Sequence, residues 1–157
     1  MATDLANNTV ADYNWITPNQ YNDMHTALNG GFMGQTGDRA KILQGDNFLS
    51  QVVPQIMASS AYQNNGVIVI WWDESEDDGM AGDNGDNFDH TIGEIVISSL
   101  AHANVNGLPY ASSINYSHSS DLRTWQEVFQ VGPFLRHAQN TPDLSDLFKP
   151  GVIPTKP

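Results

Sequence analysis

Two adjacent carboxylates, Asp73 and Glu74, are the residues of this sequence best placed to do chemistry. They follow directly on a continuous apolar run at residues 67–72, which has the pattern of a buried strand. In open α/β sheets, ligands bind at the carboxyl ends of the strands. Hard divalent cations such as Ca²⁺ and Mg²⁺ prefer several oxygen ligands. We therefore predict that Asp73 and Glu74 hold a divalent metal ion, with Ca²⁺ or Mg²⁺ as the expected metal.

The two carboxylates open an acidic segment, residues 73–89, in which eight of the seventeen residues are Asp or Glu. Such charges lie within a Debye length of one another, about 8–10 Å, so they either spread into solvent or share a cation. Both interpretations stay open for residues 76–86. The segment has no EF-hand register. We predict Asp89, which closes the segment, as a further metal ligand.

Three histidines, His25, His90 and His118, have neighbouring polar residues that suit a functional role. His90 follows Asp89, and His25 lies near a carboxylate; such a ring serves as a metal ligand, or as an acid or base. A structural hydrogen bond explains the His90 pair equally well, and the His25 pair taken alone is a weaker signal. His118 stands among serines at an expected helix start, where backbone N–H groups favour an anion, although ordinary capping also explains the serines. Two further histidines lack a chemical neighbour and are predicted to be surface or packing residues: His102 and His137.

Expected helices and strands alternate along the chain around these residues. Apolar positions recurring at i, i+4 and i+8 predict a core-facing helix over residues 46–59, which Pro54 is expected to kink or divide. The run at residues 67–72 predicts a strand buried on both faces, as in parallel sheets. A second buried strand is predicted within residues 92–100, although Glu94 interrupts its apolar pattern. This order of elements predicts an α/β fold.

The rest of the chain predicts one more helix and an irregular tail. Ser120 or Asp121 is expected to cap a helix with one apolar, core-facing side. That side consists of Leu122, Trp125, Val128 and Phe129. From Pro142 onward the chain is expected to pack as an irregular strap or to fray. With 157 residues, the length suits one domain, which we assign to residues 1–157.

Composition excludes several classes of protein. Eighteen acidic residues against six basic ones give a net charge of −12, which opposes binding to the phosphate backbone of a nucleic acid. No apolar run approaches the roughly 18 residues of a membrane-spanning helix. The polar residues 1–12 lack the pattern of a signal peptide. The absence of cysteine excludes disulfides, thiolate metal sites and cysteine nucleophiles.

Several segments, taken in order, resemble the bacterial phosphoesterase family of phosphatidylcholine-type phospholipases C and acid phosphatases, a branch of the alkaline-phosphatase-like superfamily. The segments are residues 13–19 with 22–25, 67–74, 89–90 with 94–98, and 118–124. The resemblance implies a three-layer α/β sandwich, metal-assisted hydrolysis of phosphate esters, and a secreted or periplasmic parent protein. The family's upstream metal motif and its Ser or Thr nucleophile have no counterpart here. We therefore expect a partial domain, the C-terminal half of the catalytic one.

The resemblance also assigns roles to particular residues. Asp73 and Glu74 match the adjacent acidic pair that holds the family's metal. His25 matches a histidine near the phosphate pocket, and His90 matches the histidine of an Asp-His segment. His118 matches the histidine that opens the next helix. The three histidines are accordingly the expected catalytic residues, and a phosphate ester is the expected substrate.

Two other functions compete with the phosphate-ester hydrolase. One is a non-catalytic Ca²⁺-binding module built on the acidic segment. The other is a carboxylic-ester hydrolase, which the absence of a G-x-S-x-G nucleophile elbow disfavours. A partial domain would also leave a sheet edge exposed, so we expect the chain to self-associate through that edge.

Overall fold

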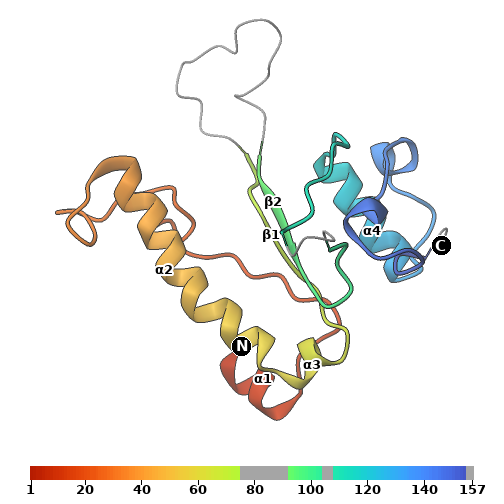
Figure 1. The fold of residues 1–157 in the computed structure, drawn as a ribbon, viewed down its shortest axis with the longest axis horizontal. Helices are drawn as coiled ribbons and strands as arrows, with labels where there is room; N and C mark the ends of the chain where they lie inside the picture. Colours follow the sequence, from red (N-terminus) through yellow and green to blue (C-terminus); the bar gives the residue numbers. More distant parts are fainter. Residues whose placement is uncertain (75–91, 104–107, 155–157) are drawn as a thin grey trace, which may run out of the picture. The chain divides into compact units, whose positions relative to one another are not determined.

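The computed structural model describes residues 1–74, 92–103 and 108–154. Within these ranges, helices combine with a small two-stranded sheet (Figure 1), which agrees with the expected partial α/β domain. The chain divides into two compact units, Met1–Gly66 and Val67–Pro157. Among the described residues, no helix is both long and apolar enough to cross a membrane.

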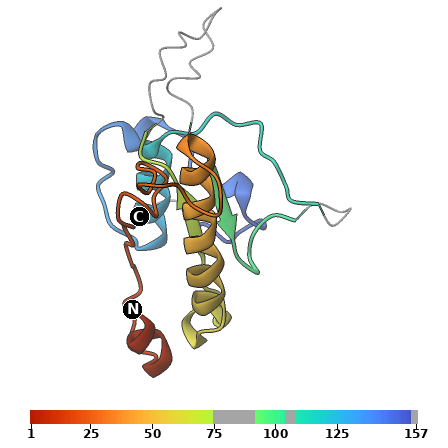
Figure 2. The same ribbon diagram turned by 90° about the vertical axis from the view of Figure 1, so that its left-hand side faces the viewer.

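The first unit is organised around α2, a helix of 21 residues over Gly37–Met57 (Figure 2). The helix expected over residues 46–59 is therefore present but begins earlier. Its first half escaped the periodicity analysis because small and polar side chains are buried there. Pro54 lies inside the last turn of α2, and the helix continues past it to Met57. Two shorter helices complete the unit: α1 (Ala2–Asn7) and α3 (Ser60–Gln63).

A buried glutamine on α2 fastens the preceding loop to the helix. The side chain of Gln44 is only 3% exposed. Its Oε1 accepts a hydrogen bond from the Leu28 N–H at 2.9 Å. Its Nε2 donates to the carbonyls of Tyr21 and Thr26, at 2.7 and 2.9 Å. This one side chain thereby holds the loop that carries His25.

The sheet of the second unit consists of β1 (Ile68–Trp71) and β2 (Glu94–Ile97). Both expected strands are confirmed near their centres. Their pairing is antiparallel, with Trp71 opposite Glu94, and every residue of β1 is only half-buried. The prediction of a strand of the parallel-sheet kind, buried on both faces, is therefore wrong. An unbroken apolar run shows that both faces of a strand are apolar, but it does not determine the direction of the neighbouring strand.

The C-terminal tail supplies the core of the second unit, which confirms that it packs as a strap. Its buried apolar side chains are Leu144, Phe148 and Ile153. Partly buried residues, among them Val96 of β2, pack against this cluster. The Lys149 N–H donates to the Leu100 carbonyl at 2.9 Å, which ties the tail to the chain beyond β2. Two short 3₁₀ helices lie in the tail region: η3 (Arg136–Asn140) and η4 (Ser145–Leu147).

Helix α4 covers His118–Val128, with Ser117 as its N-cap residue. It therefore begins slightly earlier than predicted. Ser117 and Ser120 form a capping box, in which the Ser117 N–H donates to Ser120 Oγ at 3.2 Å. This arrangement confirms the capping interpretation of the serines. In Figure 1 the C-terminal segment, in blue, runs alongside this helix.

The expected apolar side of α4 does not face the core, so that prediction is wrong. Three of its members are substantially exposed: Leu122 at 38%, Val128 at 36% and Phe129 at 39%. The buried side chains are instead polar, namely Ser120, Asp121, Thr124, Gln126 and Glu127. Hydrogen bonds make this burial possible: Thr124 Oγ1 donates to the Ser120 carbonyl at 2.8 Å and accepts from the Leu144 N–H at 2.9 Å.

Candidate functional site at the end of strand β1

One hydrogen bond joins the start of α4 to the end of β1. His118, the first residue of α4, places Nε2 3.2 Å from the Trp72 carbonyl oxygen. Its ring centroid lies 4.9 Å from that of Trp71. Because a carbonyl oxygen can only accept, Nε2 is the donor of this bond, and Nδ1 is the ring nitrogen that can serve another partner. Since Trp72 directly precedes Asp73 and Glu74, the predicted catalytic histidine and the acidic pair come to the same end of β1.

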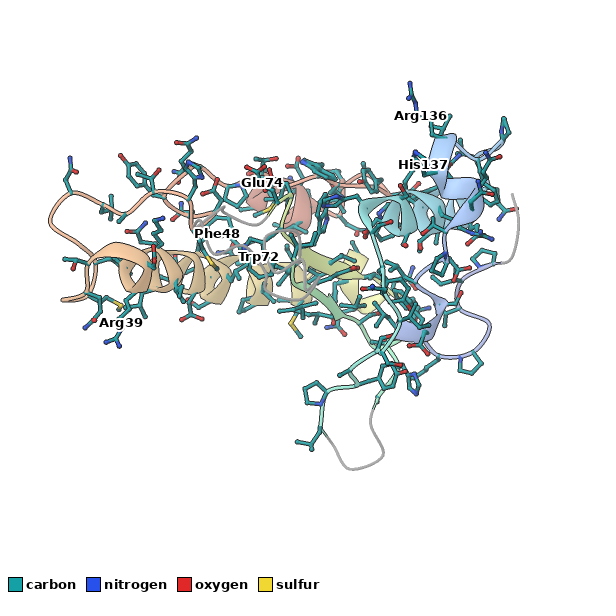
Figure 3. The ribbon with its side chains drawn as sticks, turned by 90° about the horizontal axis from the view of Figure 1, so that it is seen from above. Arg39, Phe48, Trp72, Glu74, Arg136 and His137 are labelled. Atoms are coloured by element: carbon teal, nitrogen blue, oxygen red, sulfur yellow. The ribbon has the colours of Figure 1, made fainter. Side chains whose placement is uncertain are left out.

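Asp73 and Glu74 are both exposed where the chain leaves β1. Figure 3 labels Trp72 and Glu74 at this position. Their carboxylate oxygens are the donor type that Mg²⁺ and Ca²⁺ prefer, so their chemistry fits the implied metal. In residues 1–74, 92–103 and 108–154, no group of three His, Cys, Asp or Glu side chains is placed to hold a metal ion. The metal-binding role of Asp73 and Glu74 stays a prediction.

The other predicted site residues belong to other parts of the chain. Asp89 and His90 are not among the described residues. His25 belongs to the first unit, in the loop held by Gln44, and its side chain is exposed. Its backbone N–H donates to Asp23 Oδ1 at 2.9 Å, so this bond shapes the turn and does not orient the ring. The proposed role of His25 near a phosphate group stays a prediction.

The sequence analysis missed a pair of carboxyl groups beside His118. Glu94 opens β2, and Asp121 follows His118 by one turn of α4. Glu94 Oε1 and Asp121 Oδ1 are buried and have no hydrogen-bond partner among the described residues. Burial, together with the charge of Asp121, raises the pKa of Glu94 to about 7. Burial also raises the pKa of Asp121, although His118 opposes this effect.

A signal for this pair was present in the sequence. Glu94 is the one charged residue in the apolar stretch at residues 92–100, and an ionisable side chain in such a run needs a partner. Asp121 gave no comparable signal, because an acidic residue near a helix start is explained by capping. The partnership itself depends on a contact between β2 and α4, which the sequence analysis did not predict.

His102 has chemical neighbours, contrary to prediction, although its role in packing is confirmed. Its Nδ1 lies 3.0 Å from the Asp146 carbonyl oxygen, and its ring stacks on Tyr110 with centroids 3.9 Å apart. The Asp146 carboxylate accepts from Ser112 Oγ at 2.6 Å and from the Tyr110 hydroxyl at 2.8 Å. These bonds lower the pKa of Asp146. The cluster joins η4 to residues more than thirty positions earlier in the chain, so no local sequence pattern predicts it.

A shallow surface depression on the first unit contains none of the predicted site residues. It has a volume of about 410 Å³ and is lined by Gln35, Arg39, Ile42 and Leu43. Arg39 projects from α2 there (Figure 3). The depression is open and broad, so the chemistry of the side chains locates the candidate site better than the surface shape does.

Comparison with known families agrees with the resemblance seen in the sequence. The model of a family described as Phosphoesterase family matches residues 1–132, which is more than half of the chain. The chain therefore belongs to the phosphoesterase family, whose members' name indicates hydrolysis of phosphate esters. The matched range contains Asp73, Glu74 and His118. No curated protein and no solved structure matches the chain.

Proposed function

We propose that the chain is a metal-assisted hydrolase of phosphate esters, of the phospholipase C or acid phosphatase type, with its reacting centre at the end of β1. The observation that carries the proposal is the hydrogen bond between His118 and the Trp72 carbonyl, at 3.2 Å. This bond fixes a histidine beside the point where Asp73 and Glu74 leave the strand. Membership of the phosphoesterase family supports the same reaction class.

The proposed roles follow from the chemistry of each side chain. Asp73 and Glu74 would hold the Mg²⁺ or Ca²⁺ through their exposed carboxylate oxygens. A bound divalent cation supplies Lewis-acid polarisation of a phosphoryl oxygen. His118 stands at the N-terminus of α4, where backbone N–H groups favour an anion. With Nε2 bonded to the Trp72 carbonyl, its protonated ring donates from Nδ1 to a phosphoryl oxygen and offsets the charge that develops there.

Three further residues complete the proposal. Asp89 would add a third carboxylate ligand from the far end of the acidic segment, and His90 would act beside it as an acid or base. His25 would provide a second imidazole to the phosphate group. These assignments rest on the family resemblance and on residue type, and variants of the three residues test them directly.

The experiment is hydrolysis of p-nitrophenyl phosphate and its diester by the purified chain, with and without a chelator. Asp73→Asn and Glu74→Gln are expected to abolish the metal-dependent turnover, because an amide is a weaker ligand than a carboxylate. His118→Asn is expected to reduce turnover by about 100-fold through the loss of one donor. Asp46→Asn, at an exposed carboxyl group on α2, is the matched control and should keep full turnover. Unchanged turnover in Asp73→Asn would refute the proposal.

The same set of variants separates the competing functions. Calorimetric binding of Ca²⁺ without turnover of either ester would favour the non-catalytic Ca²⁺-binding module. Turnover of p-nitrophenyl acetate that is indifferent to chelation and to Asp73→Asn would favour a carboxylic-ester hydrolase. The proposed phosphate-ester hydrolase requires both metal binding and metal-dependent turnover.

A further inference from the structure

Three side chains of α4 form hydrogen bonds with the segment that follows η3. Ser120 Oγ lies 2.9 Å from Thr141 Oγ1. Arg123 Nη1 donates to the Thr141 carbonyl oxygen at 2.8 Å. One residue farther along the helix, Thr124 Oγ1 accepts from the Leu144 N–H at 2.9 Å. This segment therefore holds α4 at three points, and Thr141 supplies two of them.

The first of these bonds, the hydroxyl bridge between Ser120 and Thr141, continues to the residue before His118. Ser120 Oγ also accepts a hydrogen bond from the Ser117 N–H, at 3.2 Å. Because Ser120 is 0% exposed, its hydroxyl depends on protein partners, and the bond to Thr141 holds Oγ where it accepts from Ser117. His118 follows Ser117 directly as the first residue of α4. The hydroxyl bridge thereby fixes the backbone from which the His118 side chain starts.

The ring of His118 has its own contacts with the end of β1. Nε2 lies 3.2 Å from the Trp72 carbonyl oxygen, and the ring centroid lies 4.9 Å from that of Trp71. His118 is otherwise exposed, so a substrate can reach it. Side chains adopt a small set of staggered rotamers, so the ring cannot follow a displaced backbone freely. These contacts therefore require the first turn of α4 to stay in place.

We propose that Ser120 and Thr141 are positioning residues for His118, because their hydroxyl bridge fixes the first turn of α4 so that the histidine meets the end of β1. Both hydroxyls act through His118 and not on the substrate. The inference rests on the proposed function only for what His118 does to a phosphate ester, since the position of its ring can be measured without one. Thr141 lies beyond residues 1–132, so the bridge joins the part of the chain that matches the family model to the tail.

The hydroxyl bridge differs from the neighbouring bonds in its distance from His118. Thr124 lies more than one turn farther along α4, and its hydroxyl donates to the Ser120 carbonyl at 2.8 Å. The bonds of Thr124 stabilise the interior of the helix, whereas the bridge acts on its first turn. Loss of the Thr124 hydroxyl should therefore lower stability and leave the His118 ring in place. Loss of the bridge should release the ring.

The first test is nuclear magnetic resonance of the full chain without substrate, following the Overhauser contact between the His118 and Trp71 rings. The wild type and Thr141→Ser, which keeps the hydroxyl, should show this contact. Thr141→Val, which has nearly the same shape but no hydroxyl, should lose it. Ser120→Ala removes the other hydroxyl of the bridge, should also lose the contact, and serves if Thr141→Val fails to fold. Thr124→Val is the matched control and should keep the contact.

The second test is turnover of p-nitrophenyl phosphate. Thr141→Val should lower kcat by about 10-fold and leave KM nearly unchanged, because a misplaced catalytic group slows the reaction more than it weakens binding. Thr141→Ser should restore kcat. In a His118→Asn background, Thr141→Val should lower kcat no further, because the threonine acts through the histidine.

Three results would overturn the inference. The first is a ring contact that survives in both Thr141→Val and Ser120→Ala. The second is an equal loss of the contact in Thr124→Val, which would make the hydroxyl bridge one structural bond among several. The third is a full additional loss of kcat from Thr141→Val in the His118→Asn background. If the wild type has no turnover while the ring contact follows the hydroxyls, the proposed hydrolase activity fails and the positioning of His118 stands.

Discussion

Replacing Gln44 with alanine tests how the loop that carries His25 is held. The Gln44 side chain makes three hydrogen bonds, one from the Leu28 N–H and two to backbone carbonyls, with distances of 2.7–2.9 Å. All three partners belong to the loop before α2, and the glutamine is 3% exposed. The substitution removes every one of these bonds and leaves α2 itself with a good helix former.

The expected destabilisation follows from the three bonds. A typical intramolecular hydrogen bond contributes about 1 kcal/mol net to stability. Loss of three gives about 3 kcal/mol if the loop stays in place with its backbone groups unsatisfied. Since about 1.4 kcal/mol corresponds to a tenfold change in an equilibrium constant, amide exchange of Leu28 should accelerate by about 100-fold.

Urea unfolding followed by fluorescence, together with hydrogen exchange at Leu28, provides the assay. Gln51→Ala makes the same chemical change at an exposed position of α2, and should alter the free energy of unfolding by less than about 0.5 kcal/mol. If Gln44→Ala destabilises the chain no more than Gln51→Ala does, and Leu28 exchange is unchanged, Gln44 does not hold the loop. The orientation of His25 would then need another source.

Three further predictions concern the second unit. Because the folded chain raises the pKa of Glu94 from 4.5 to about 7, it binds this proton more tightly than the unfolded chain does, and stability should fall as pH rises through this window. The upper limit of this loss in the free energy of unfolding is about 3 kcal/mol, and solvent screening of the half-buried side chain reduces it to about 1–2 kcal/mol. Glu94→Gln should abolish this pH dependence of the free energy measured by urea unfolding. Thr124→Val removes the acceptor of the buried Leu144 N–H and should lower the free energy of unfolding by about 2 kcal/mol, and a value near zero would show that the bond is dispensable. Within the described residues the two-stranded sheet has open outer edges and Ile95 is 49% exposed, so sedimentation velocity should show association that grows with concentration, whereas a clean monomer would argue against it.

Local patterns in the sequence were sufficient to predict several elements. The apolar runs predicted both strands, because short apolar stretches rich in β-branched and aromatic residues favour strands over helices. The serines before residue 121 predicted the start of α4 to within a few residues. The pair Asp73–Glu74 was recognised as a candidate site because its chemistry follows from residue type and from its place after a strand.

Long-range contacts account for what could not be predicted. The direction of β2 relative to β1 depends on the path of the chain between them, which leaves no trace in either strand's pattern. The buried face of α4 is polar because Leu144, twenty residues beyond Thr124, supplies a partner for the threonine hydroxyl. The Glu94–Asp121 pair likewise exists only when β2 and α4 meet. In the last two cases a polar group is buried where the chain meets a segment that is distant in sequence.

Hydrolysis of p-nitrophenyl phosphate before and after chelation tests the central claim most directly, namely that the end of β1 is a metal-dependent phosphate-ester site. The account predicts turnover that a chelator abolishes and that added Mg²⁺ or Ca²⁺ restores, in the wild type but not in Asp73→Asn. Turnover that survives chelation, or that is equal in the wild type and Asp73→Asn, would contradict it.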